Sequence, residues 1–161
     1  MSTDSAGVHG HRRVGEPAWR NPVVNQAFNG FDPAKIARWS EKKKDALMQD
    51  ACIVRNRAKI EATVALARIT LDLREKGGLA RHLWSFVDGR PIQNKRRSMA
   101  EMQAESEVSR AIAKDLRGRG GNFVGPTIIY AFMQATGMVN DHLVDCHRHA
   151  ECAALGRKSH V

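Results

Sequence analysis

The sequence predicts an all-α protein. Apolar residues recur at helical spacing in several stretches, and no stretch alternates apolar and polar residues in the way a half-buried strand does. Asp, Ser, Asn and Pro stand where helices would begin, and Gly stands where they would end. The chain has 161 residues, enough for one domain with its own core. We expect a disordered tail over residues 1–21 and a helical domain over residues 22–161.

The first half of the domain should contain two short helices and one long one. Asp32 can cap a short helix that begins at the following proline, and Ser40 begins the next helix. After a short break, Asn56 can cap a long helix whose apolar residues form a continuous stripe. The glycine pair 77–78 should end this helix.

The second half should contain three or four further helices. We expect helices over Leu79–Val87 and Glu105–Leu116, separated by turns and a basic loop. Pro126 opens an apolar helix that should be buried on most of its sides and that Gly137 interrupts. A last polar helix or coil should follow.

The charge balance favours a polyanionic partner. The net charge is +9, and such a charge strengthens binding to nucleic acid through the release of counterions. Aromatic residues make up 6% of the chain, which is few for stacking the bases of a single strand. With no membrane-length apolar run and no export signal, we expect a cytoplasmic protein without a membrane partner. Three cysteines do not form a disulfide framework.

The first candidate site is the break before the long helix. Arg55, Arg57 and Lys59 gather at a turn that opens into a helix, where free backbone N–H groups and the helix dipole favour an anion. The pattern suggests a helix-hairpin-helix that grips a nucleic-acid backbone. An ordinary helical corner with solvated charges is the alternative.

The second candidate is the glycine-rich loop around residues 118–125. Its glycines would let a backbone approach a phosphate, and its arginines would supply charge. A flexible connector before a buried helix explains the same composition.

The third candidate is a pair of metal ligands. His142 and Cys146 are four residues apart, so on a helix they would share one face, and imidazole and thiolate are common zinc ligands. Two ligands make half of a tetrahedral site, and simple packing of Cys146 is the alternative. Asp141 or Asp145 could orient a metal-bound histidine.

Four blocks resemble the DNA-3-methyladenine glycosylase I family. They are FDPAKIA at 31–37, QDACIVRNRAKI at 49–60, LWSFV at 83–87, and FVGPTIIYAFMQATGMVNDHLVDC at 123–146. The resemblance implies a helical domain of the helix-hairpin-helix superfamily. It also implies hydrolysis of the N-glycosidic bond of 3-methyladenine in double-stranded alkylated DNA, as part of base excision repair.

The resemblance also implies specific sites. The hairpin with Ile53, Arg55, Arg57 and Lys59 is similar to the family's DNA-backbone anchor. His142 and Cys146 match the second half of a structural zinc site. A monomeric enzyme is expected.

The N-terminal part of the chain departs from the family pattern. The family's first zinc pair, the aromatic walls of its base pocket and its recognition glutamate have no counterpart here, so no catalytic residue can be assigned. Gly121 replaces a family aromatic, which should loosen its loop. We therefore also consider a catalytically inactive, truncated remnant that only binds the DNA backbone.

Overall fold

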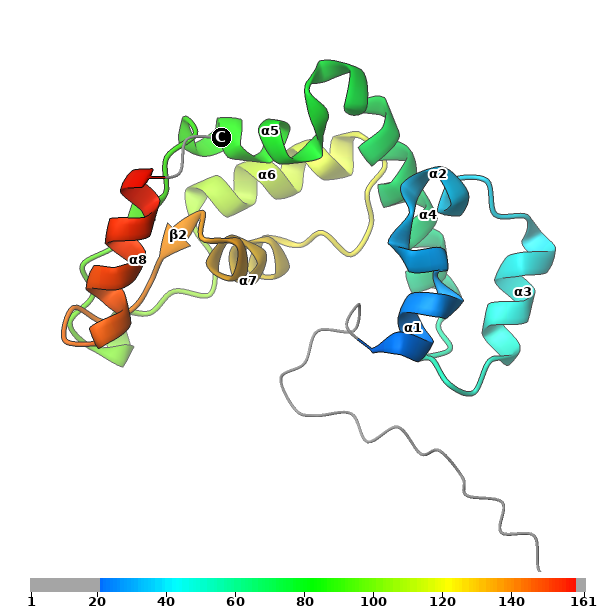
Figure 1. Cartoon of the computed structure of the whole chain (residues 1–161), viewed down its shortest axis with the longest axis horizontal. Coiled ribbons are helices and arrows are strands. Elements are labelled where there is room, and N and C mark those ends of the chain that lie inside the picture. Colours follow the sequence, from blue (N-terminus) through cyan, green and yellow to red (C-terminus); the bar gives the residue numbers. More distant parts are fainter. Residues whose placement is uncertain (1–20, 159–161) are drawn as a thin grey trace, which may run out of the picture.

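The computed structural model describes residues 21–158, and most of these residues lie in helices (Figure 1). The predicted tail lies outside the described residues except for Asn21, whose side chain caps the first helix. Three helices begin where caps were expected: Asp32, Ser40 and Asn56 each accept a backbone N–H of the helix that follows. The all-α prediction is confirmed.

One end of the molecule is built from the first four helices (Figure 1). These elements are α1 (Pro22–Ala27), the 3-10 turn η2 (Asn29–Phe31), α2 (Pro33–Ile36), α3 (Glu41–Gln49) and the first half of α4 (Arg57–Asp72). Their apolar residues form two small clusters, one centred on Ile36 and Val64 and the other on Leu47 and Ile60.

The main core lies in the middle of the molecule. It is formed by the second half of α4, α5 (Gly78–Trp84), η4 (Ser85–Val87), α6 (Glu107–Gly118) and α7 (Pro126–Thr136). The 3-10 turn η3 (Arg74–Lys76) lies between α4 and α5. Leu73, Ile112 and Met133 are among its fully buried side chains. Because α4 contributes to all three clusters, it connects the two parts of the molecule.

The other end carries α8 (His147–Lys158) and two very short strands. Strands β1 (Ile92–Gln93) and β2 (Val139–Asn140) pair in parallel, with Ile92 opposite Val139. The sequence did not predict this pair, because two-residue strands are too short to show alternation. The 3-10 turn η5 (Met99–Glu101) precedes α6.

The apolar helix α7 is less buried than the sequence suggested. Ile129, Tyr130 and Met133 face the core, whereas Ile128 and Phe132 are 62% and 41% exposed. The buried side of α7 packs on α6, and Ile128 and Phe132 lie on its exposed side. No helix between residues 21 and 158 has the length and apolar character needed to cross a membrane.

Candidate nucleic-acid interface and metal ligands

Side-chain hydrogen bonds stabilise both ends of the turn between α3 and α4. Asp50 accepts the backbone N–H of Cys52, and Asn56 accepts that of Lys59. Ile53 points into the cluster with Leu47 and Ile60, so its side chain supports the turn from inside. Cys52 is not among the described residues with positive φ, so the turn does not need a glycine at this position.

The three predicted cations do not form one cluster. Arg57 turns back onto the helices and pairs with Glu41, Asp45 and Glu61. The hydrogen bonds that Arg57 donates to the carboxylates of Glu61 and Asp45 raise the pKa of Arg57 and hold its guanidinium against them. The side chains of Arg55 and Lys59 are exposed and have no ion pair with any residue in the part of the chain that the structure describes.

The loop between α6 and α7 is tight. The N–H of Gly121 donates to the carbonyl oxygen of Leu116 at 2.8 Å, and a Cβ atom at Gly121 would lie 2.8 Å from that oxygen. Gly121 therefore lets the chain close onto the end of α6. The expectation that it loosens the loop is wrong.

The N-terminus of α7 faces this loop without a side-chain cap. Gly125 is the N-cap and Pro126 opens the helix, so the amides of Thr127 and Ile128 have no acceptor within the helix. The guanidinium of Arg117 lies next to Gly125, within 3.5 Å of where its Cβ would be. Arg117 is exposed and has no carboxylate partner among residues 21–158. A free cation beside the positive end of a helix dipole is a favourable place for a phosphate.

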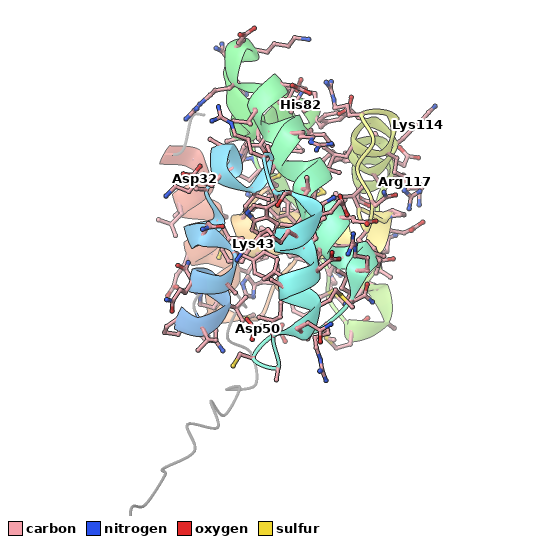
Figure 2. The ribbon with its side chains drawn as sticks, turned by 90° about the vertical axis from the view of Figure 1, so that its right-hand side faces the viewer. Asp32, Lys43, Asp50, His82, Lys114 and Arg117 are labelled. Atoms are coloured by element: carbon pink, nitrogen blue, oxygen red, sulfur yellow. The ribbon has the colours of Figure 1, made fainter. Side chains whose placement is uncertain are left out.

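The loop between α6 and α7 adjoins the start of α4. Ala58 and Glu61 from the start of α4 line a small hollow together with Asn122 and Phe123. Figure 2 looks at this side of the molecule, with Asp50 marking the α3–α4 turn and Lys114 and Arg117 along the edge formed by α6. The structure thus brings together the two candidate phosphate sites, which lie about 60 positions apart in the sequence.

His142 and Cys146 are close enough to share a metal, although they do not lie on a helix. They precede α8, so the predicted helical HxxxC is wrong. The His142 Nδ1 and Cys146 Sγ atoms are 3.8 Å apart. A tetrahedral zinc with one nitrogen and one sulfur ligand separates them by about 3.6 Å. Within residues 21–158 no third His, Cys, Asp or Glu joins them in a metal-binding group.

Asp141 has a different role from the one expected. Its carboxylate accepts hydrogen bonds from Asn94, Arg96, Tyr130 and Gln134, which leaves it no contact with the imidazole of His142. Burial alone would raise the pKa of Asp141, but these four donors outweigh it and lower the pKa to about 2. Asp141, which directly follows β2, therefore links the basic loop at residues 94–98 to α7 through hydrogen bonds.

A cavity of about 760 Å³ lies between the end of α7, β2 and α8, with Trp84, His142 and Cys152 in its wall. Of the described residues that line the cavity, only Asp141 carries a carboxylate. Both of its oxygens accept the hydrogen bonds given above. The amide of Asn140 is likewise bound to Gln93 and to the backbone of α8. The described residues that line the cavity therefore include no carboxylate without a hydrogen-bond partner.

The family model described as methyladenine glycosylase matches residues 19–149. The chain belongs to the methyladenine glycosylase family.

Named relatives agree with this family. The chain is 43% identical over 122 residues to a DNA-3-methyladenine glycosylase of Haemophilus influenzae, covering 75% of this chain and 66% of that protein. It is 42% identical over 120 residues to DNA-3-methyladenine glycosylase 1 of Escherichia coli, covering 74% and 64%. The chain thus spans just under two thirds of the length of these curated relatives.

Solved structures of methyladenine glycosylases have the same fold. A crystal structure of 3-methyladenine DNA glycosylase I superposes with a TM-score of 0.73 at 40% identity, covering 78% of this chain and 69% of the other. A structure of the Staphylococcus aureus enzyme, titled for its recognition of 3-methyladenine, gives 0.72 at 31% identity, covering 76% and 66%. The expected glycosylase-like helical fold is thereby confirmed over the part of the chain that these structures match.

Sequence reasoning missed the polar network of this methyladenine glycosylase domain and the exposure of Phe123. Asn94 and Arg96 lie more than 40 positions from Asp141, and no spacing rule connects them. The phosphate reading of the glycine loop stays a prediction, based on three glycines that stand beside arginines.

Proposed function

We propose that this chain acts in the excision of 3-methyladenine from double-stranded alkylated DNA, by hydrolysis of the N-glycosidic bond. The observation that carries the proposal is the match of residues 19–149 to methyladenine glycosylases, with relatives of that name at 42% and 43% identity. The net charge of +9 suits such a substrate, because phosphates supply most of the affinity of a protein for DNA.

The start of α4 and the neighbouring loop between α6 and α7 are the proposed binding surface for the DNA backbone. Arg55 and Lys59 present free cations at the start of α4, and Arg117 stands beside the uncapped N-terminus of α7. Two phosphate contacts on one face hold the backbone in register while a nucleotide leaves the stack. Ile53 serves this surface indirectly, by fixing the α3–α4 turn from inside.

The chemistry needs little from the protein beyond a pocket and a positioned water. Alkylation at N3 leaves the adenine positively charged, which makes it a better leaving group. Among the described residues that line the cavity beside α8, the carboxylate of Asp141 already accepts hydrogen bonds at both of its oxygens.

Release of the free base tests the activity. Purified protein is incubated with methylated duplex DNA, and free 3-methyladenine is quantified by chromatography, with the Haemophilus influenzae relative as positive control. The proposal predicts release above the spontaneous rate. Release at the spontaneous rate, from protein shown to be folded, would refute it.

The second candidate is a protein that binds DNA without chemistry. The occupied oxygens of Asp141 favour it, since the cavity then lacks an acid. This candidate predicts binding that falls with salt, is equal for methylated and unmethylated duplexes, and is accompanied by no base release. A clear preference for methylated DNA would exclude it.

We also propose that His142 and Cys146 contribute two ligands to a structural zinc site. A bound zinc would fix the segment before α8, and its remaining ligands must come from outside the described residues or from solvent. Metal analysis after dialysis tests this, with Cys146→Ser as the variant and Cys152→Ser as the control. The proposal predicts that C146S lowers the zinc content and C152S does not. Equal zinc in all three proteins would refute it.

We further propose that the protein is a monomer and acts in the cytoplasm. Light scattering during size-exclusion chromatography tests the oligomeric state, because a dimer would double the measured mass.

A further inference from the structure

The basic loop at residues 94–98 joins β1 to η5 and contains three consecutive cations, Lys95, Arg96 and Arg97. It follows β1, which pairs with β2 at the end of the molecule opposite α3 (Figure 1). The basic loop therefore lies apart from the proposed DNA-binding surface at the start of α4.

The side chains of the basic loop point inward and outward in turn. Asn94 and Arg96 are half-buried, whereas Lys95 and Arg97 are exposed. Such alternation is typical of an extended segment, in which residues two apart lie on the same side at roughly 7 Å from one another. Neither Lys95 nor Arg97 forms an ion pair with a carboxylate of residues 21–158. Both charges are therefore available to a partner on one side of the loop.

The inward side chains hold the basic loop in place. The guanidinium of Arg96 donates to the carboxylate of Asp141 at 2.9 Å, and only 13% of the Arg96 side chain and 6% of the Asp141 side chain are exposed. The side-chain amide of Asn94 donates to the same carboxylate at 2.6 Å. Because separating the members of a buried ion pair is costly, these contacts resist displacement of the loop.

Hydrogen bonds fix the backbone of the basic loop as well. The N–H of Asn94 donates to the carbonyl oxygen of Asn140, and the carbonyl oxygen of Arg96 accepts the N–H of Val144. The Nε2 atom of His149, on α8, lies 2.9 Å from the carbonyl oxygen of Asn94. The loop is thus ordered before any anion binds, so binding does not have to order it.

The carboxylate of Glu101 also contacts the basic loop. It accepts the backbone N–H of Arg97 and lies 3.3 Å from the hydroxyl oxygen of Ser98. Donors of the loop therefore engage both Glu101 and Asp141, and the outward side that carries Lys95 and Arg97 remains positive.

We propose that the basic loop is a second, separate phosphate-binding surface, which contacts the backbone of the same DNA duplex through Lys95 and Arg97. The inference rests on the proposed DNA substrate and adds a contact at the opposite end of the molecule. A domain of this size is roughly 40 Å across. A duplex of about 20 base pairs is roughly 68 Å long and can reach both surfaces, whereas one of about 8 base pairs is roughly 27 Å long and cannot.

The test compares the double variant Lys95→Ala with Arg97→Ala to the control double variant Arg74→Ala with Lys76→Ala. Arg74 and Lys76 are also an exposed Arg and Lys two positions apart, and they lie on η3, at the top of Figure 1 and away from β2. Each double variant loses two positive charges, so the general attraction to DNA falls equally in both. Since all four side chains are exposed, both variants should keep the wild-type melting temperature.

Each protein is titrated with both lengths of duplex over a series of salt concentrations. On the longer duplex, K95A/R97A should bind roughly tenfold more weakly, and the magnitude of its salt slope should fall by about 2, because two phosphate contacts are lost. On the shorter duplex, which the surface at the start of α4 holds, its slope should equal that of the wild type. R74A/K76A should keep the wild-type slope on both duplexes.

Three results would overturn the inference. The first is a wild-type slope for K95A/R97A on the longer duplex, or absence of DNA binding by the wild type. The second is an equal loss in R74A/K76A, which would show that only the net charge matters. The third is an equal loss on both lengths of duplex, which would show that the basic loop is not a separate contact.

The outcome is separable from that of base release. A lowered slope in K95A/R97A on the longer duplex alone supports the inference even when the wild type releases no base, which refutes only the enzymatic activity. Base release by the wild type with unaltered DNA binding by K95A/R97A overturns only the role of the basic loop.

Discussion

The ion pairs of individual side chains determine which cations are available to bind DNA. Arg55, Arg57 and Lys59 look equivalent in the sequence, but Arg57 neutralises carboxylates on α3 and α4 while the other two remain free. A guanidinium that is held by carboxylates has to break those pairs before it can bind a phosphate. Its contribution to DNA affinity is therefore small.

Replacing these arginines by alanine should separate the two roles. Arg55→Ala should weaken DNA binding and lower the magnitude of the salt slope by about 1, because one phosphate contact is lost. Arg57→Ala should leave the slope unchanged. Titration of each variant with duplex DNA at several salt concentrations measures this, and a lowered slope in R57A would show that Arg57 leaves its carboxylates for DNA.

The buried carboxylate of Asp141 should make stability depend on acid. Its pKa is about 2 in the folded protein and near 3.8 when unfolded, so its contribution of about 2 kcal/mol is complete above pH 4. That contribution disappears as the pH falls from about 4 towards 2. Asp141→Asn should lower the free energy of unfolding at pH 7 and weaken its dependence on pH below 4.

The exposed Asp145 offers a matched control. Asp145→Asn should change the free energy of unfolding little, both at pH 7 and at pH 3. Denaturant unfolding at the two pH values measures all three proteins. If D141N lost as much stability as wild type between pH 7 and pH 3, other carboxylates would account for the acid sensitivity.

At the scale of elements, the α6–loop–α7 unit depends on close backbone contact. A methyl group at Gly121 would meet the Leu116 carbonyl oxygen, whereas one at Gly118 meets no atom within 4 Å. Gly121→Ala should therefore cost about 1–3 kcal/mol of stability and weaken DNA binding by displacing the loop. Gly118→Ala should be neutral or slightly stabilising, since alanine favours a helix.

Thermal unfolding and DNA titration of both glycine variants test this. Equal stability of G121A and G118A would mean that the loop can shift away from α6 without loss. In that case the tight approach at Gly121 would not be what places Arg117 and Phe123.

At the scale of the whole molecule, α4 joins the small apolar clusters at one end to the main core. Ile60 lies in one of the small clusters and Ile112 in the main core, and both are 1% exposed. Each change to alanine should cost about 2–5 kcal/mol. Because α4 belongs to both regions, both variants should shift one cooperative transition.

Helical content and tryptophan fluorescence during denaturant unfolding measure that transition. Two separate transitions in Ile60→Ala, with the second at the wild-type midpoint, would show that the end formed by α1–α3 unfolds independently. The proposed DNA-binding surface would then rest on a part of the molecule less stable than its core, because the α3–α4 turn lies at that end.

The sequence by itself determined the helical class, the caps of α2, α3 and α4, and the family. These depend on local backbone chemistry and on long matching blocks, both of which are written in consecutive residues. Only the tertiary structure decided that Arg57 is neutralised and that Asp141 binds four donors. It also decided that the glycine loop lies against the start of α4. Those facts depend on contacts between residues far apart in the chain, whose distances no local pattern encodes.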